Sequence, residues 1–372
     1  MRALSLGRVF AGAFFLSSAL LLACNTASLK QPGPGEVPAE EIPDEDAGTT
    51  PTLDGATRDP GAQDAAAVPV SKGVTVQVQP SDNAAALIAA MRGATKSVHV
   101  VMYLLSSDEF INALIDQHKA GRDVKVILNQ NFPPGGGDNA RAFSRLSAQG
   151  VPVVWAPAGY TYTHAKMLII DSARIIVMTM NMTFSSASTN REYIATDPDA
   201  DDVADAEKIF AGDYANTSTS VTGKLVLSPR NTSLVDARAR LKALIDGATT
   251  SVDVEVQSLS DFPLVDALIL AHQAGLKVRV VLDGKTTGNT TSQSDALAKL
   301  KQYGVPTRLV SSLDIHAKAI VADGARAFIG SQNFTPTGLL NNREVGVVFD
   351  GPAEVAKVST VIAQDFDKGV AP

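Results

Sequence analysis

Between residues 73 and 372, stretches whose hydrophobic residues are spaced as in a strand alternate with stretches whose hydrophobic residues are spaced as in a helix. Val74 to Val78 alternate with polar neighbours, as in a strand with one buried face. Residues 97–105 form a mostly apolar, β-branched run, which is typical of a strand buried on both faces. Residues 108–120 follow a helical pattern that stops at Gly121. The same reading gives a helix over 83–92, a strand over 123–128, a helix over 139–148 and a strand over 151–155.

The order of elements returns in the second half of the chain. The predicted elements there are a strand over 224–227, a helix over 231–245, a strand over 251–258, a helix over 263–274, a strand over 277–282 and a helix over 295–302. A Ser/Thr/Asn-rich stretch over 212–222 separates the halves, so we expect domains at 73–216 and 217–372. Strands that alternate with helices predict an α/β fold with a mainly parallel sheet in each half, flanked by helices.

A set of polar residues repeats at a fixed offset of 152 residues. The first set is His164, Lys166, Asp171, Asn181 and Glu192, and the second is His316, Lys318, Asp323, Asn333 and Glu344. Each set also contains an Asn-Arg pair immediately before its glutamate. Polar residues kept in one register through a duplication indicate a repeated structural unit that carries chemistry.

The spacing within each set predicts a geometry. A histidine and a lysine two residues apart on a strand point to the same face. Asp171 and Asp323 fall at hairpin turns, where a structural role is favoured over direct catalysis. The returning strands bring Asn181 and Asn333 back toward the His-Lys pairs. If the halves meet about a pseudo-two-fold axis, two histidines, two lysines and two asparagines surround one site.

Such a site suits a phosphodiester. Lysine and asparagine side chains supply donors for the non-bridging oxygens as negative charge develops. One imidazole can attack phosphorus, and the other can protonate the leaving oxygen and then activate water or an alcohol. The sequence contains neither the ligand spacing of a zinc site nor a phosphate-binding P-loop.

Charge is distributed unevenly along the 372 residues, whose net charge is −7. Residues 25–70 carry nine acidic and two basic side chains, and the first 24 residues carry two basic ones. The remainder therefore has a net charge of only −2. This near neutrality weakens the prediction of a nucleic-acid partner, because proteins that bind nucleic acids usually present a basic surface. Hydrophobic residues make up 45% of the chain, which is enough for a buried core.

The duplicated set resembles the phospholipase D superfamily, whose pattern is H-x-K, an aspartate five residues after the lysine, and then G-S-x-N or G-S-x-x-N. The second copy matches in full, whereas Met178-Thr179 replaces Gly-Ser in the first. The resemblance covers about residues 74–368. It implies two repeated domains about a pseudo-two-fold axis in a monomer, and a phosphohistidine route that needs no metal or other cofactor.

The resemblance also implies roles for individual residues. His164 is the expected nucleophile and His316 the acid and base, although the opposite assignment stays open. Lys166, Lys318, Asn181 and Asn333 would hold the phosphate, with hydroxyl support from Ser331 and Thr179. Glu192 and Glu344 would orient the imidazoles and raise their basicity. Met178 in place of glycine would narrow one side of the site.

The amino-terminal residues resemble an export signal. Arg2 and Arg8 precede the apolar run 10–22, and Leu21-Leu22-Ala23-Cys24 resembles a bacterial lipobox. The expectation is a lipoprotein signal peptide over 1–23, lipidation of Cys24 and a protein anchored to a membrane of a bacterial cell envelope. The alternative is an ordinary signal peptide with a chance cysteine. Residues 24–72 are acidic and rich in Pro and Gly, which predicts a disordered tether.

The leading hypothesis is therefore an exported phosphodiesterase of the phospholipase D type. It would hydrolyse glycerophospholipids or transfer their phosphatidyl group to an alcohol. A metal-independent endonuclease on the same scaffold is one alternative, and nucleic acid is a partner only in that case. A non-catalytic binder of phosphorylated ligands is another, motivated by Met178-Thr179.

Overall fold

The structure is a computed structural model that describes residues 68–217, 219–221, 223–229 and 236–372. Its strands form two sheets. The first has the order β1 (Thr75–Gln79), β7 (Asn190–Asp197), β6 (Arg174–Met178), β5 (Lys166–Ile170), β2 (Ser97–Met102), β3 (Asp123–Leu128) and β4 (Val153–Trp155). The second has the order β11 (Thr307–Val310), β10 (Lys277–Asp283), β9 (Ser251–Val256), β13 (Lys318–Ala322), β14 (Arg326–Gly330), β15 (Glu344–Phe349) and β8 (Val226–Ser228).

The α/β fold with two repeated sheets is confirmed, but the prediction that each sheet is mainly parallel is wrong. Strands β2, β3 and β4 pair in parallel, as do β9, β10 and β11. Strands β5, β6 and β7, like β13, β14 and β15, pair antiparallel. One reason is the tight turns at Asp171 and Asp323, because the hairpins there make β5 and β6, and likewise β13 and β14, antiparallel neighbours.

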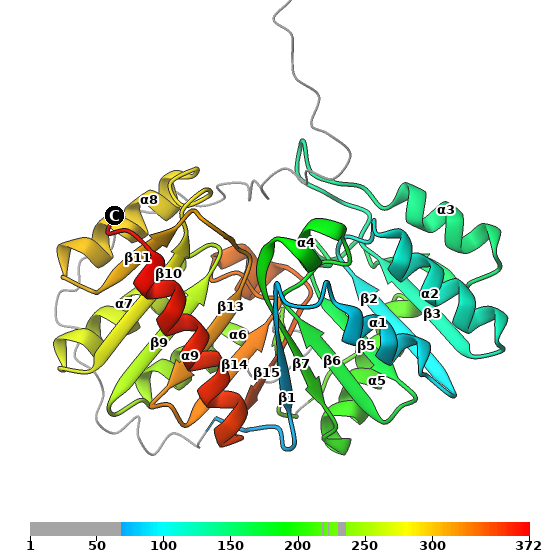
Figure 1. Cartoon of the computed structure of the whole chain (residues 1–372), viewed down its shortest axis with the longest axis horizontal. Coiled ribbons are helices and arrows are strands. Elements are labelled where there is room, and N and C mark those ends of the chain that lie inside the picture. Colours follow the sequence, from blue (N-terminus) through cyan, green and yellow to red (C-terminus); the bar gives the residue numbers. More distant parts are fainter. Residues whose placement is uncertain (1–67, 218, 222, 230–235) are drawn as a thin grey trace, which may run out of the picture. The chain divides into compact units, whose positions relative to one another are not determined.

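Helices cover the outer face of each sheet (Figure 1). On the first sheet these are α1 (Ala85–Arg92), α2 (Asp108–Lys119) and α3 (Ala140–Ala148), and on the second they are α6 (Ala237–Asp246), α7 (Phe262–Gln273) and α8 (Thr291–Gln302). The short α4 (Phe184–Ser188) and the π-helical turn Thr337–Asn341 follow β6 and β14. Helices α2 and α7 end as predicted, at Gly121 and Gly275, which adopt φ values of 81° and 87°.

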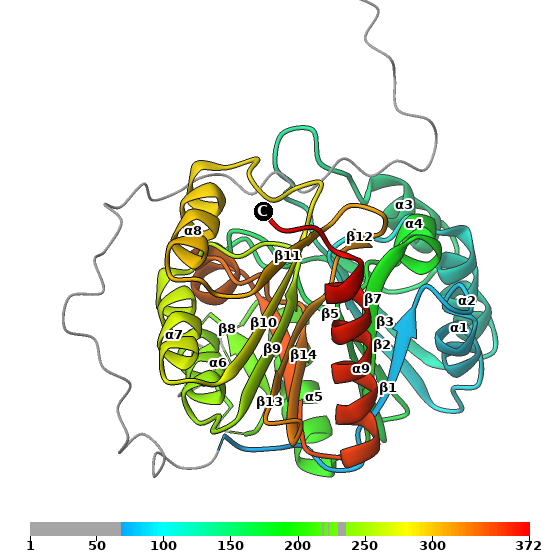
Figure 2. The same cartoon turned by 60° about the vertical axis from the view of Figure 1, so that its left-hand side comes forward.

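Two further helices lie against the inner faces of the sheets, beside the contact of β6 and β7 with β14 and β15. Helix α5 (Ala200–Tyr214) contacts β5 and β6, and α9 (Pro352–Lys368) contacts β1, β13 and β14 (Figure 2). Their apolar residues join the inner faces of both sheets in one hydrophobic core that contains, for example, Val177 and Phe210 from the first half and Val321 and Val358 from the second. Each sheet has a separate core beneath its outer helices. The halves are therefore joined through a shared apolar interior.

The tether was predicted to extend to residue 72, and its last residues depart from that prediction. Val68 is buried in the core beneath α6 and α7, and the Ser71 N–H donates to the Val348 carbonyl at 2.7 Å. The apolar side chains of Val68 and Val70 explain this packing. The predicted signal peptide 1–23, Cys24, the rest of the tether and the first residues of the predicted helix 231–245 lie outside the described residues. The boundary at 216/217 stays a prediction.

No helix within the described ranges is long and apolar enough to cross a bilayer.

Candidate active site

Each His-Lys pair lies at the entry to a central strand. His164 and His316 precede β5 and β13 by two residues, rather than lying on the strands as expected, and each lysine is the first strand residue. Lys166 Nζ lies 2.6 Å from His164 Nε2 and donates to the His164 carbonyl at 2.9 Å. Lys318 Nζ donates to the His316 carbonyl at 2.9 Å. All four side chains are buried.

Each histidine pairs with the glutamate of the opposite half. His164 Nδ1 lies 2.8 Å and 2.9 Å from the two carboxylate oxygens of Glu344. His316 Nδ1 lies 2.8 Å from Glu192 Oε1. Both carboxylates are fully buried. A carboxylate at Nδ1 fixes the tautomer that leaves Nε2 as the reacting nitrogen, and it stabilises the imidazolium when that nitrogen gains a proton.

The backbone repeats this exchange. The His164 N–H donates to the Arg343 carbonyl at 3.0 Å, and the His316 N–H donates to the Arg191 carbonyl at 3.2 Å. Thr163 forms a bridge with Arg343, while β12 (Asp314–Ile315) pairs in parallel with the start of β7. The Asn-Arg-Glu segment of one half therefore lies against the histidine segment of the other. The predicted pseudo-two-fold site is assembled by these crossed contacts.

The two arginines of these segments are anchored to the inner helices, again across the halves. Arg343 Nε and Nη2 donate to Asp213 of α5 at 2.8 Å and 2.6 Å. Arg191 Nε donates to Asp365 of α9 at 2.6 Å. Sequence reasoning missed both aspartates, although they are also 152 residues apart and the repeat could have revealed them. They hold the segments that carry the glutamates.

A second missed pair holds the residue before each histidine. Asn129 Oδ1, after β3, accepts from the Thr163 N–H at 2.9 Å. Asp283 Oδ1, at the end of β10, accepts from the Ile315 N–H at 3.0 Å. Their offset is 154 rather than 152, because the two halves differ by two residues before the histidines. These buried side chains fix the approach of each histidine to its strand.

The two halves differ beside the lysines. Tyr103 follows β2 and packs edge-on against the His164 ring, with 4.6 Å between the ring centroids. Lys166 Nζ lies 4.8 Å from the centre of the Tyr103 ring. The equivalent residue after β9 is Gln257, whose Oε1 accepts from Lys318 Nζ at 3.1 Å. One ammonium therefore lies near an aromatic ring and the other near an amide. This contrast makes the environments of the two histidines unequal.

Asn181 and Asn333 lie at the ends of the central strands. Met182 forms a bridge with Leu105, and Phe334 with Leu259, which places each preceding asparagine just beyond β2 or β9. Both asparagines are buried, and within the described residues their Oδ1 atoms have no hydrogen-bond partner. Buried amides with unused capacity at this edge suit the binding of a polar ligand.

The hydroxyl groups of Thr179 and Ser331 are hydrogen-bonded within the protein. Thr179 Oγ1 donates to Glu192 Oε2 at 2.5 Å, and Ser331 Oγ donates to the Val345 carbonyl at 3.2 Å. Each hydroxyl also accepts the N–H of the residue after the glutamate. Thr179 therefore holds Glu192 directly, and Ser331 holds the residue after Glu344. The expected support of a phosphate by these hydroxyls stays a prediction.

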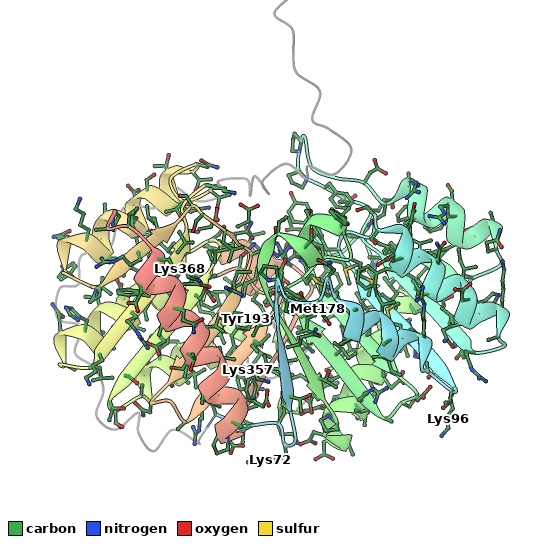
Figure 3. All side chains as sticks on the ribbon, in the orientation of Figure 1. Lys72, Lys96, Met178, Tyr193, Lys357 and Lys368 are labelled. Carbon is green, nitrogen blue, oxygen red and sulfur yellow. The ribbon has the colours of Figure 1, made fainter. Side chains whose placement is uncertain are left out.

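Met178 likewise departs from expectation, because it does not narrow the site. Its side chain is fully buried in the core beneath α1 and α2 (Figure 3). In the second half a Cβ at Gly330 would lie 2.6 Å from the Phe328 ring and 2.9 Å from Gly346 Cα. Glycine is therefore required by crowding in one copy, and methionine is accommodated in the other.

Asp171 and Asp323 make structural contacts, in keeping with the favoured role. Asp171 accepts from the N–H groups of Thr95, Lys96 and Ser97 at 2.7–3.0 Å. Asp323 does the same for Thr249, Thr250 and Ser251. Partial burial raises the pKa of Asp171, but the three N–H groups outweigh it and hold that pKa well below its usual range. Each aspartate ties its hairpin to the start of the neighbouring strand.

Comparison with known proteins places this geometry in a family. A family model described as "Cardiolipin synthase, PLD-like domain" matches residues 87–214 and again 241–368. Polyphosphate kinase of Pseudomonas putida is 25% identical over 231 residues, which are 58% of this chain and 32% of that protein. Mitochondrial cardiolipin hydrolase of Danio rerio is 32% identical over 116 residues, which are 31% of this chain and 50% of that protein.

The fold is also found in a solved structure. Phosphatidylserine synthase of Haemophilus influenzae has a TM-score of 0.61 at 10% identity, with 79% of this chain and 86% of that chain covered. This chain covers about a third to a half of the curated relatives' own length. The two family matches together cover more than half of the chain. The chain therefore belongs to the phospholipase D-like family, whose domain it contains twice.

Proposed function

We propose that this protein cleaves the phosphodiester of glycerophospholipids through a phosphohistidine, and passes the phosphatidyl group to water or to an alcohol. The crossed pairing of His164 with Glu344 and of His316 with Glu192 carries this proposal. It gives each of the two imidazoles a buried glutamate of the opposite half at its Nδ1 atom. A relative named as a mitochondrial cardiolipin hydrolase supports a lipid substrate.

In the first step, Nε2 of His164 attacks phosphorus and the bond to the head-group oxygen breaks. The His316 imidazolium, stabilised by Glu192, gives its proton to that oxygen, and the head-group alcohol leaves. Lys166, Lys318 and the amides of Asn181 and Asn333 bind the non-bridging oxygens, where negative charge develops.

In the second step, neutral His316 takes a proton from water or an alcohol, whose oxygen forms a bond to phosphorus. The bond between phosphorus and His164 Nε2 breaks, which releases phosphatidic acid or a phosphatidyl alcohol. The proton on His316 is then in place for the next cycle. The same residue acts first as acid and then as base.

The contacts of His164 favour it as the nucleophile. Lys166 Nζ, 2.6 Å from its Nε2, is a donor, so that nitrogen presents a lone pair. Tyr103 packs against the ring and restricts its rotation. When a phosphodiester binds, the ammonium can turn to a non-bridging oxygen and leave the lone pair aimed at phosphorus.

The test uses the full chain in mixed micelles with phosphatidylcholine and a primary alcohol, in the presence of a chelator. We expect phosphatidyl alcohol from the parent protein and none from His164→Ala or His316→Ala. His118→Ala, in the last turn of α2, is the matched control and should keep full activity. Full activity in either of the first two variants would rule out the two-histidine mechanism. Cleavage of DNA without any lipid product would favour the endonuclease instead.

The nucleophile is identified with a p-nitrophenyl phosphodiester, whose leaving group needs no proton. His316→Ala should then form the phosphoenzyme but hydrolyse it slowly, so that mass spectrometry finds the adduct on His164. His164→Ala should form no adduct. An adduct on His316 in the His164→Ala protein would reverse the assignment.

We also propose that the protein is an exported lipoprotein anchored through Cys24. The support is the apolar run that ends at this single cysteine. A bacterial host fed a labelled fatty acid should label the parent and not Cys24→Ala. An unlabelled parent would favour the ordinary signal peptide.

A further inference from the structure

Four segments near the active site lack charged residues altogether. They are 129–137, 156–163, 180–190 and 331–342, and together we call them the rim. Charged residues make up 19% of the chain, so stretches of this combined length would ordinarily contain several. The rim instead consists of small, amide, hydroxyl, aromatic and aliphatic residues, with four prolines.

The topology places these segments together. Strands β3, β4 and β6 run in the same direction within the first sheet, so the three segments after them leave from one edge. The fourth segment begins immediately after β14. Asn129 Oδ1 accepts from the Thr163 N–H, and the Thr161 N–H donates to the Asn341 carbonyl at 3.2 Å. The rim also contains Asn181 and Asn333, so it borders the active site.

The rim carries an exposed aromatic side chain. Phe184, the first residue of α4 and the third after Asn181, is 72% exposed. Within the described residues, Val370 is the other large hydrophobic residue with such exposure, at 64%. Phe132, Tyr160 and Tyr162 of the rim are partly exposed. Aromatic residues with small polar neighbours are typical of surfaces that enter the boundary between lipid head groups and acyl chains.

An ion pair lies at the neighbouring edge. Lys285, after β10, donates to Asp314 of β12. A nucleic acid needs lysine or arginine side chains to replace its counterions, and the rim has none. An uncharged surface with an exposed phenyl group instead suits a partner that has an apolar interior beneath a neutral polar layer.

We propose that the rim docks onto a phospholipid bilayer, with Phe184 inserted below the head groups, so that a lipid reaches the histidines from the membrane surface. This inference rests on the proposed function and adds that the lipid substrate is taken from a bilayer. Docking is driven by apolar burial and not by ion pairing, so it should persist at high salt.

The test uses the full chain carrying Cys24→Ser, which removes any lipid anchor, and compares Phe184→Ser with the matched control Val370→Ser. Co-sedimentation with neutral phosphatidylcholine vesicles is measured at low and high salt. Turnover is measured on those vesicles and on a short-chain phosphatidylcholine below its critical micelle concentration. We expect Phe184→Ser to lose roughly tenfold in vesicle binding and in the ratio of vesicle to monomer turnover, whereas Val370→Ser matches the parent.

A second measurement reports insertion directly. In a Trp155→Phe background, Phe184→Trp provides a single tryptophan whose emission should shift to shorter wavelength when vesicles are added. Val370→Trp in the same background should not shift. No shift at position 184, or a Phe184→Ser protein that matches the parent on vesicles, overturns the docking proposal.

The docking proposal and the proposed function fail differently. If both lipid forms are turned over and Phe184→Ser has no effect, the docking proposal is wrong and the proposed enzymatic function stands. If vesicle binding depends on Phe184 but neither lipid form is turned over, the lipid-cleaving function is wrong and the docking proposal stands. Binding to DNA that salt abolishes, with no binding to vesicles, overturns the docking.

Discussion

At the scale of single residues, the duplication separates shared roles from unequal ones. His164 and His316 pair with equivalent glutamates, each taken from the other half. Tyr103 and Gln257 occupy equivalent positions after β2 and β9 but offer their lysines a ring and an amide, respectively. A two-step reaction needs one nucleophile and one acid. Differences such as the one between Tyr103 and Gln257 are therefore expected to decide which histidine is the nucleophile and which is the acid.

Replacement of Glu344 by glutamine should slow the reaction by about 10²–10⁴-fold, because an amide holds the His164 ring but does not stabilise its positive charge. The measurement is phosphoenzyme formation from the p-nitrophenyl ester, with the folded state followed by circular dichroism. Asp350→Asn, close in sequence but outside the site, is the control. An unchanged rate in Glu344→Gln would show that the carboxylate charge is not needed.

Asp171→Asn should lower stability without entering the chemistry. The pKa of Asp171 is depressed in the folded state, so its contribution is present above the ordinary carboxyl pKa of about 4 and is lost as the pH falls below it. We expect a loss of about 1 kcal/mol at pH 7 for this partly exposed group, which diminishes toward pH 3. Urea unfolding at several pH values measures it, with exposed Asp201→Asn as control. Abolished turnover at unchanged stability would indicate a catalytic aspartate.

At the scale of elements, β7, β9 and α9 meet through buried polar groups. The Tyr193 hydroxyl of β7 donates to Glu255 Oε2 of β9 at 2.5 Å. Arg191 of β7 is paired with Asp365 of α9. Burial, followed by the nearby Asp365 carboxylate, raises the pKa of Glu255 to about 8. Burial therefore favours the protonated form of Glu255 at this junction of elements from both halves.

A carboxyl group whose pKa is raised on folding favours the folded state at low pH and loses that advantage as the pH rises toward its folded pKa. For Glu255 the window runs from about 4.5, the ordinary value, to about 8. Glu255→Gln should therefore match the parent near pH 5 and exceed it by about 1–4 kcal/mol near pH 9. Urea unfolding across this range checks it, with exposed Glu109→Gln as control. Parallel pH profiles for Glu255→Gln and the parent would contradict the raised pKa.

At the scale of the whole molecule, the two halves share one interior. The core between the sheets contains residues of β5, β6 and α5 together with residues of β13, β14 and α9. The ion pairs Arg343–Asp213 and Arg191–Asp365 cross the same boundary. Because the halves bury each other's apolar surface and complete each other's site, we expect them to unfold as one unit.

The single tryptophan, Trp155, lies in β4 of the first half and reports on that half alone. Leu268→Ala in α7 should remove about 2–5 kcal/mol from the core of the second half. If unfolding is cooperative, this change shifts the Trp155 fluorescence transition in urea as much as the circular dichroism transition. A fluorescence midpoint that stays in place while circular dichroism shows an earlier phase would mean that the halves unfold separately.

Much of the fold could be predicted because it is encoded locally. The period of the apolar positions determines strands and helices, and glycines such as Gly121 end helices through backbone conformations that other residues disfavour. The prediction of parallel sheets was wrong because alternation of strands and helices describes only the first part of each half. The hairpins at Asp171 and Asp323 turn the later strands antiparallel.

The sequence by itself determined the duplication, the residues in it that carry chemistry and the family that they resemble, since a constant offset and local periodicity are properties of the chain. Only the tertiary structure decided which copy of each residue meets which. Glu344 belongs beside His164, and Asp213 beside Arg343, because the sheets pack face to face and bring opposite copies together. A repeat shows that two residues are equivalent, but it does not show whether each serves its own half or the other. That choice depends on how the halves pack.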